Sequence, residues 1–203
     1  MTRSSNIAAR GLVPGLIRRL GPNDTEGLAG HLLRLDADAR AARFGGLVSD
    51  IALRDHALLA LAGGAVVLGY VSDGVLRGVG ELHAIEGTRP MTGEAAFSVE
   101  AGFQGRGIGS KLMRRVLSAA TARGIRRVVV VCQSSNRMMR RLAGHFDAHL
   151  EIVGTETTGH LTTPAATPLR LLRVAVSDGF DLAAENVERQ ARLFLSTLPD
   201  RAA

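Results

Sequence analysis

A glycine-rich stretch in the middle of the chain, residues 99–109, constrains the fold more than any other part of the sequence. It reads V-E-A-G-F-Q-G-R-G-I-G. The alternating residues 94–100 precede it as a strand would, and residues 110–123 follow it with apolar side chains at helical spacing. Glycine reaches backbone conformations that other residues avoid, and it lets a ligand approach the main chain. The stretch therefore predicts a strand, a tight turn and the start of a helix.

The predicted helix start has the properties of an anion-binding site. No strong side-chain cap precedes Ser110, so the first N–H groups and the positive end of the helix dipole are available to an anion such as phosphate. A Walker A loop needs Gly-Lys-Ser/Thr in succession, whereas the order here is Gly109-Ser110-Lys111. The dinucleotide fingerprint needs G-x-G-x-x-G and a later acidic residue, yet no Asp or Glu occurs in residues 101–146. Both of these phosphate loops are disfavoured.

The spacing Q-x-x-G-x-G, from Gln104 to Gly109, resembles the acetyl-CoA pyrophosphate loop of the GNAT superfamily of N-acetyltransferases. The order of predicted elements over residues 16–153 is also similar to that of the GNAT fold. The resemblance implies an α/β fold with a mixed, mostly antiparallel central sheet of about six to seven strands flanked by helices. A glycine-rich turn that binds no ligand is the alternative interpretation.

Hydrophobic periodicity and turn residues divide the chain into elements. Strands are expected at residues 16–20, 65–71, 75–86, 94–100, 127–133 and 150–157, with a closing run near Leu161 or over residues 169–176. Helices are expected at residues 23–36, 37–44, 50–62, 110–123 and 136–145, the first starting with a capping box of Asn23 and Glu26. Because residues 127–133 are apolar and β-branched, that strand is expected to be buried on both faces. Ser72-Asp73-Gly74 predicts a hairpin turn.

Three regions are expected along the chain: an N-terminal arm at residues 1–14, an acetyltransferase domain at 15–176, and an extra C-terminal helix within 177–203. The last has an apolar stripe at helical spacing that must pack on the domain or on a partner subunit, which leaves a homodimer open. Its residues are Leu182, Val187, Ala191, Phe194, Leu195 and Leu198.

Composition limits the class of protein. The 203 residues suit one domain, and they contain neither an apolar run of membrane-spanning length nor a secretory signal pattern. The single cysteine, Cys132, excludes an internal disulfide framework and a cysteine-cluster metal site. We therefore expect a cytoplasmic protein without a metal or a membrane partner.

The positive charge is concentrated. Residues 101–146 hold ten basic side chains and no acidic one, which leaves 15 basic against 19 acidic residues elsewhere. This basic region includes the glycine-rich loop and its flanking helices, as a cofactor with several phosphates would require. A solvated basic face is the simpler alternative. A nucleic-acid-binding module is disfavoured, because the chain has only six Phe and one Tyr for base stacking.

The resemblance also implies which residues act. The cofactor acetyl-CoA would contact the backbone of the strand before the loop, the loop itself and an Asn after the valine-rich strand: Phe97, Val99, Gln104, Gly105, Arg106, Gly107, Ile108, Gly109, Ser110 and Asn136. Glu94 matches the strand carboxylate that some members use as a general base, with Glu81 and His83 as further candidates and Glu100 as a weaker one. Many members carry a Tyr as the acid for the leaving group, but Ala143 occupies that place.

Two further side chains are candidates for catalysis. His145 could protonate the leaving thiolate, although a cation at a helix end is the simpler interpretation. Cys132 could form an acyl-enzyme, but a cysteine in a valine-rich strand is more often inert.

The predicted function is an N-acetyltransferase in which a primary amine attacks acetyl-CoA directly in a ternary complex; an acyl-CoA sensor without turnover is the alternative. A cationic acceptor is expected, namely a protein lysine, a polyamine or an aminoglycoside, because the helical segment before residue 65 is rich in acids. They are Asp24, Glu26, Asp36, Asp38, Asp50 and Asp55. Residues 35–44 also resemble a segment of bacterial protein-lysine acetyltransferase-like members.

Overall fold

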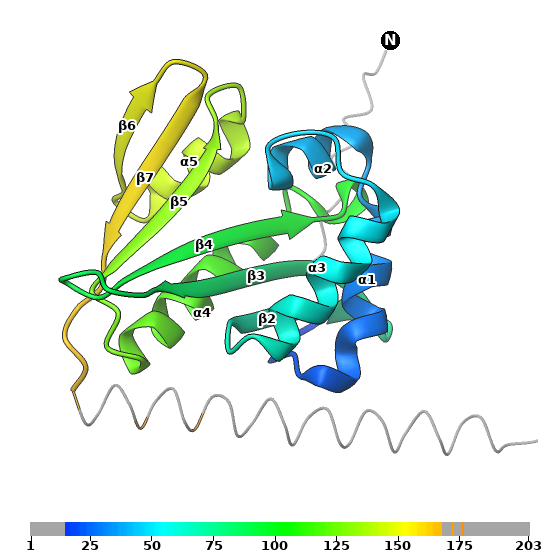
Figure 1. Cartoon of the computed structure of the whole chain (residues 1–203), viewed down its shortest axis with the longest axis horizontal. Coiled ribbons are helices and arrows are strands. Elements are labelled where there is room, and N and C mark those ends of the chain that lie inside the picture. Colours follow the sequence, from blue (N-terminus) through cyan, green and yellow to red (C-terminus); the bar gives the residue numbers. More distant parts are fainter. Residues whose placement is uncertain (1–14, 168–171, 173–175, 177–203) are drawn as a thin grey trace, which may run out of the picture.

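The computed structural model describes residues 15–167, together with Leu172 and Val176. Within them a seven-stranded sheet forms the middle layer, and helices cover both of its faces (Figure 1). The strands are β1 Leu16–Arg19, β2 Val66–Ser72, β3 Val75–Ile85, β4 Thr92–Val99, β5 Arg127–Gln133, β6 His149–Val153 and β7 Glu156–Thr162. The α-helices are α1 Thr25–Arg34, α2 Ala37–Phe44, α3 Asp50–Ala62, α4 Ile108–Ala122 and α5 Arg137–His145. Two short 3-10 helices are η1 Pro22–Asp24 and η2 Ala101–Phe103.

The sheet is mixed but mostly antiparallel, as the sequence predicts. Its strand order is β1-β2-β3-β4-β5-β7-β6. Among the strand pairs of the described residues, only β4 and β5 are parallel. That pairing extends from Thr92 opposite Arg127 to Glu94 opposite Val129, after which the strands separate. Figure 1 shows the resulting wedge between β4 and β5.

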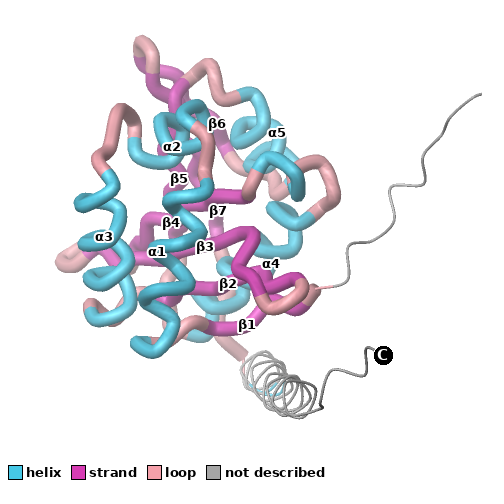
Figure 2. The backbone as a smooth tube through the Cα atoms, turned by 90° about the vertical axis from the view of Figure 1, so that its right-hand side faces the viewer, coloured by secondary structure: helices cyan, strands magenta, loops and turns pink. Residues whose placement is uncertain are grey.

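Each face of the sheet has its own apolar core. On one face, Leu112, Met113 and Val116 of α4 are fully buried against the strands. On the other face, Leu28 of α1 and Leu53 of α3 are fully buried. Figure 2 shows α1 and α3 on one side of the strands and α4 on the other. Because core side chains are closely packed, these helices hold β2, β3 and β4 in a fixed arrangement.

The hairpin turn between β2 and β3 forms as predicted. Asp73 and Gly74 have φ values of 49° and 73°, the backbone of a tight hairpin turn. The expected capping box at the first helix is wrong. The chain first makes the 3-10 turn η1, and α1 begins at Thr25. There the carboxylate of Asp24 accepts the N–H of Gly21 at 2.9 Å instead.

The strands at the other end of the sheet differ from expectation in two ways. β5 is not buried on both faces, because its side chains alternate and Val131 is 42% exposed. The expected strand at residues 150–157 spans the turn at Gly154, where φ is 59°, so β6 and β7 lie on either side of it. β7 ends at Thr162. The expected N-terminal arm and C-terminal helix lie outside the described residues. No helix of the described part is both long and apolar enough to span a bilayer.

Candidate active site

The wedge between β4 and β5 exposes main-chain groups of β4. The N–H of Glu100 donates to the carbonyl oxygen of Arg77 on β3 at 3.0 Å. Because successive residues of a strand direct their backbone groups to opposite sides, those of Phe97 and Val99 point away from β3, towards the wedge. The side-chain amide of Gln104 donates to the carbonyl oxygen of Val99 at 2.9 Å. The edge of β4 thus offers hydrogen-bonding groups to an extended ligand lying in the wedge.

The glycine-rich turn brings the predicted loop residues together at the end of β4. Gly107 has φ 78° and caps α4 without any side-chain hydrogen bond. Lys111 donates its N–H to the carbonyl oxygen of Gly107 at 3.0 Å, so the N–H groups of the preceding helical residues have no acceptor within the helix. The residues gathered at this helix end are Gln104, Gly105, Arg106, Gly107, Ile108, Gly109 and Ser110. The absence of a side-chain cap, inferred from the sequence, is confirmed.

Two arginines hold the aromatic ring that precedes the turn. The guanidinium carbon of Arg77 lies 5.0 Å from the centroid of the Phe103 ring, and that of Arg106 lies 5.5 Å from it. Both distances suit cation–π attraction. Arg106 is therefore oriented within the turn by a contact that the sequence alone did not reveal.

Glu100, next to the turn, joins α1 to β3 and β4. Its carboxylate accepts hydrogen bonds from Arg34 Nε at 2.9 Å and from Arg77 at 2.8 Å. Burial alone would raise the pKa of Glu100, but hydrogen bonds from His31, Arg77 and Arg34 outweigh burial and lower that pKa to about 2. The carboxylate is therefore a structural anion rather than a proton acceptor at neutral pH.

His31 continues this network into the core. The ring is fully buried, with Nε2 2.9 Å from Ser98 Oγ and Nδ1 3.3 Å from Glu100. Burial lowers the pKa of His31 more than the bond to Glu100 raises it. This contact is not predictable from local sequence patterns, because His31 and its partners are more than 60 residues apart.

Asn136 is the N-cap of α5. Its side-chain oxygen accepts the N–H of Met139 at 3.0 Å. A Cβ placed on Gly109 would lie 3.5 Å from Leu142, so α5 packs beside the start of α4.

Ala143, at the place where the family resemblance predicts a Tyr, is 2% exposed and has no side-chain group that could donate a proton. Burial raises the pKa of the Cys132 thiol, which makes it a poor nucleophile.

Glu94 lies at the closed end of the wedge. It is exposed, and it is the last residue of β4 that pairs with β5. On the other side it pairs with His83 of β3. Five residues separate it from Val99, which corresponds to about 16 Å along the strand. A group near Val99 therefore cannot be in direct contact with the Glu94 carboxylate.

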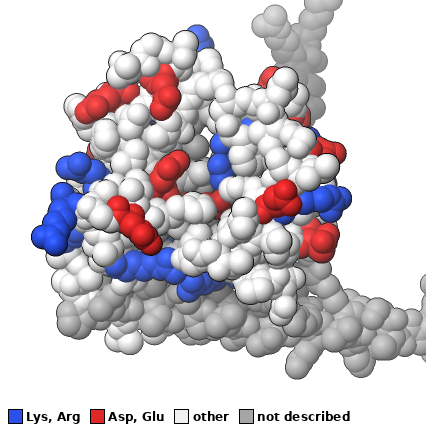
Figure 3. Space-filling model, viewed as in Figure 1, with Lys and Arg blue, Asp and Glu red and all other residues white. Residues whose placement is uncertain are grey.

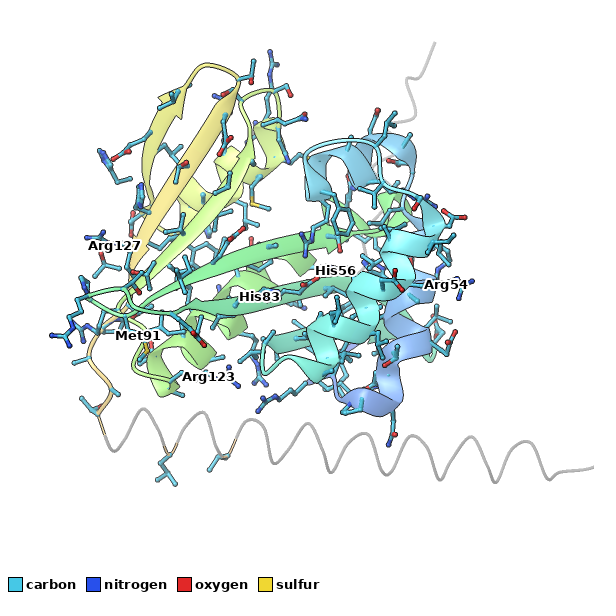
Figure 4. All side chains as sticks on the ribbon, in the orientation of Figure 1. Arg54, His56, His83, Met91, Arg123 and Arg127 are labelled. Atoms are coloured by element: carbon cyan, nitrogen blue, oxygen red, sulfur yellow. The ribbon has the colours of Figure 1, made fainter. Side chains whose placement is uncertain are left out.

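A buried ionic cluster centres on Glu81 of β3, which is opposite Ala96 of β4, on the face that α1 and α3 cover. Glu81 of β3 is fully buried; its carboxylate lies 2.7 Å from Arg43 of α2 and 3.0 Å from both His56 and His83. Burial would raise the pKa of Glu81, but hydrogen bonds from His56 and His83 and the charge of Arg43 hold it well below its ordinary value. Figure 4 shows His56 on α3 and His83 on β3. The sequence placed Glu81 and His83 on one face but missed Arg43 and His56.

Several of the acidic residues between η1 and α3 have partners within the protein. Asp24 lies 2.6 Å from Arg18, Asp50 lies 2.8 Å from Arg40, and Asp36 caps α2. Their charge is therefore a weaker argument for a cationic acceptor than the sequence suggested.

Figure 3 shows a hollow between the part formed by β5 to β7 and the part formed by α2, with basic and acidic atoms near it. In the described part of the chain, no three His, Cys, Asp or Glu side chains are grouped to hold a metal ion.

The chain matches a family model described as the acetyltransferase (GNAT) family over residues 35–146. The match covers more than half of the chain, so the protein belongs to the GNAT acetyltransferase family, as its glycine-rich loop predicted. It is an acetyl-CoA-dependent acetyltransferase. A comparison with curated proteins found no match.

Several solved structures share the fold. The GNAT domain of S. lividans PAT is 20% identical, with a TM-score of 0.61 over 72% of this chain and 89% of that one. A GNAT-family acetyltransferase from Streptococcus pneumoniae is 16% identical, with a TM-score of 0.61 over 74% and 100%. The acetyltransferase yncA from Salmonella typhimurium, solved with its cofactor acetyl-CoA, is 21% identical, with a TM-score of 0.60 over 76% and 98%. At these identities the likeness establishes the fold.

Proposed function

We propose that the protein transfers the acetyl group of acetyl-CoA to a primary amine by direct attack in a ternary complex. The main support is the position of the uncapped start of α4 beside the backbone groups of Phe97 and Val99 that face the wedge. The amides of a pantetheine arm can pair with a strand edge as an added strand does. A pyrophosphate suits the N–H groups at the helix start. One ligand with both parts therefore fits the two neighbouring features.

Specific residues would divide the work of holding the cofactor. The turn from Gln104 to Ser110 would bind the pyrophosphate through backbone N–H groups, and Arg106, oriented by Phe103, would add positive charge. The side-chain oxygen of Asn136 caps α5, so its amide nitrogen would donate to the pantetheine arm. These residues would hold the thioester in position and would take no part in the chemical step.

The wedge also suits stabilisation of the developing charge. The N–H of Val99 would donate to the thioester oxygen as a negative charge forms on it. Positioning of amine and thioester within one site would supply much of the remaining acceleration. With Ala143 buried at the usual position of the acid, the thiolate would leave with protonation by water.

The acceptor would be a cationic amine, namely a protein lysine, a polyamine or an aminoglycoside. Glu94 is exposed at the closed end of the wedge, where an anion would attract an ammonium group. We propose it as the first acceptor of the amine's proton. Because Glu94 and Val99 are about 16 Å apart along β4, this transfer would pass through water.

The test combines binding with turnover. A ligand that binds only the native state raises its thermal stability, so saturating acetyl-CoA should raise the melting temperature more than NADH or ATP does. The same protein should release CoA thiol when mixed with lysine peptides, polyamines or aminoglycosides. Binding without thiol release from any amine would instead identify an acyl-CoA sensor, and the lack of any shift with acetyl-CoA would contradict the proposal.

A further inference from the structure

We propose that His83 receives the proton that the attacking amine loses, and that Glu81 is the positioning residue that orients its ring. This inference rests on the proposed acetyl transfer and extends it by naming the path of the proton.

The geometry around Glu81 fixes which nitrogen of His83 carries hydrogen. Nε2 of His83 lies 3.0 Å from one oxygen of Glu81, and Arg43 lies 2.7 Å from the other. A carboxylate paired with a guanidinium is ionised and can only accept hydrogen bonds, so Nε2 is the donor. Nδ1 of the neutral ring then holds a lone pair. The side chain is 42% exposed, so the ring can exchange a proton with water.

The second histidine of the cluster, His56, lies beside the guanidinium of Arg43. His56 also lies 3.0 Å from Glu81, but Arg43 lies 3.4 Å from its Nε2. A cation at that distance opposes a second positive charge. The Phe44 ring further packs edge-on against His56, with the ring centroids 5.2 Å apart.

The charges that face His83 come from four elements. Glu81 of β3 is in contact with it, Glu94 of β4 is its cross-strand partner, and Arg43 of α2 and His56 of α3 lie beyond Glu81. Two of these four groups, Glu81 and Glu94, are carboxylates.

The register between β3 and β4 gives the route. His83 and Glu94 are directly opposite, so their side chains share one face with Cβ atoms about 5 Å apart. The ammonium N–H bond breaks as the proton passes through water to Glu94. It then moves to Nδ1 of His83, which restores the carboxylate, and finally to solvent. An imidazole retains a proton nearer neutral pH than a carboxylate does, so it is the better carrier.

The experiment compares His83→Ala with the matched control His56→Ala in the full chain. Thermal shift with acetyl-CoA first checks that each variant folds and binds the cofactor. We expect His83→Ala to lower kcat by about 100-fold, with little change in the KM for acetyl-CoA. It should also remove the fall of kcat at low pH, which is the acid limb of the pH profile of kcat. Added imidazole should restore part of kcat, because the partly exposed site admits it. His56→Ala should keep the limb and lower kcat by less than about 5-fold.

Two results would overturn the inference while acetyl transfer by the wild-type protein persists. One is a pH profile of kcat in His83→Ala that is the same as that of the wild-type protein. The other is an equal loss in both histidine variants without rescue by imidazole, which would show that the cluster is structural. If the wild-type protein acetylates no amine at all, the proposed function itself fails, and the inference with it.

Discussion

Glu100 shows how a single carboxylate couples the cofactor loop to the stability of the domain. Its pKa of about 2 in the folded protein lies below the ordinary value of 4.5. As pH falls, the unfolded chain therefore binds the proton first, so the stabilisation is complete above about pH 4.5 and is lost towards pH 2. We expect the unfolding free energy from urea titrations to fall by up to about 3 kcal/mol over this range through Glu100 alone. Glu100→Gln should remove most of that dependence.

Glu26 provides the control for this pH effect. Its side chain is 91% exposed, and its nearest cation, Arg54, is 3.8 Å away. Glu26→Gln should leave the acid dependence as in the wild-type protein. Parallel behaviour of Glu100→Gln and the wild-type protein below pH 4.5 would contradict the assigned role of Glu100.

Glu94 is the residue whose predicted role is tested most directly by substitution. Glu94→Gln keeps the size of the side chain but cannot accept a proton at neutral pH. We expect kcat for acetyl transfer to fall by about 10- to 100-fold, while the thermal shift with acetyl-CoA stays unchanged, because Glu94 lies far from the glycine-rich turn. Glu86→Gln, at an exposed position just after β3, is the control. Unchanged turnover in Glu94→Gln would exclude it from the proton path.

At the residue scale, the sequence could predict only what local spacing determines. Glu81 and His83 are two positions apart in a strand, so their shared face followed from the alternation of side chains. Their partners Arg43 and His56 come from helices much earlier in the chain. Which helix residue reaches a given strand residue depends on how the helices pack on the sheet, and a single sequence does not encode that contact as a pattern.

At the scale of elements, the turn into α4 depends on backbone conformation at one residue. Gly107 has φ 78°, and no atom lies within 4 Å of the position that a Cβ would occupy. The cost of Gly107→Ala is therefore conformational rather than steric, and we expect the unfolding free energy to fall by about 1 kcal/mol. Relaxation of the turn should also raise the Kd for acetyl-CoA, measured by calorimetry.

Gly102 is the matched control for this substitution. It lies in η2, its φ is outside the left-handed region, and a Cβ there would meet nothing within 4 Å. Gly102→Ala should therefore leave stability and the Kd for acetyl-CoA nearly unchanged. If Gly107→Ala changes stability and the Kd for acetyl-CoA as little as Gly102→Ala does, the turn does not depend on the left-handed conformation of Gly107.

Element limits were predictable where capping signals are local. The bounds of α2, α3 and β5 match the sequence prediction. Asp36 and Ser49 cap the two helices, and Gly45 ends α2 with φ 79°. The burial of β5 was not predictable, because a valine-rich strand looks the same whether one or both faces are covered. The described helices α1 and α3 belong to the core on β2 and β3, which leaves Val131 of β5 exposed.

At the scale of the whole molecule, the fold places two chemically different groups of residues around the wedge. Residues 101–146, which carry ten basic and no acidic side chains, form η2, α4, β5 and α5. The second group contains the buried anions Glu81 and Glu100, each surrounded by arginine and histidine. In the proposed reaction, phosphates would bind on the first side and the amine would lose its proton on the second. The wedge joins the two because β4 takes part in both.

The predicted division of the chain at residue 176 can be tested by truncation. The buried residues of both described cores lie between Leu20 and Leu161, so deletion of residues 177–203 removes none of them. We expect the shortened chain to fold with a melting temperature within about 4 °C of the full chain, which corresponds to a change of about 1 kcal/mol. It should keep the thermal shift with acetyl-CoA. Loss of cooperative unfolding after truncation would show that the segment belongs to the domain, whereas a full chain of twice the monomer mass and a monomeric shortened chain would assign it to a partner subunit.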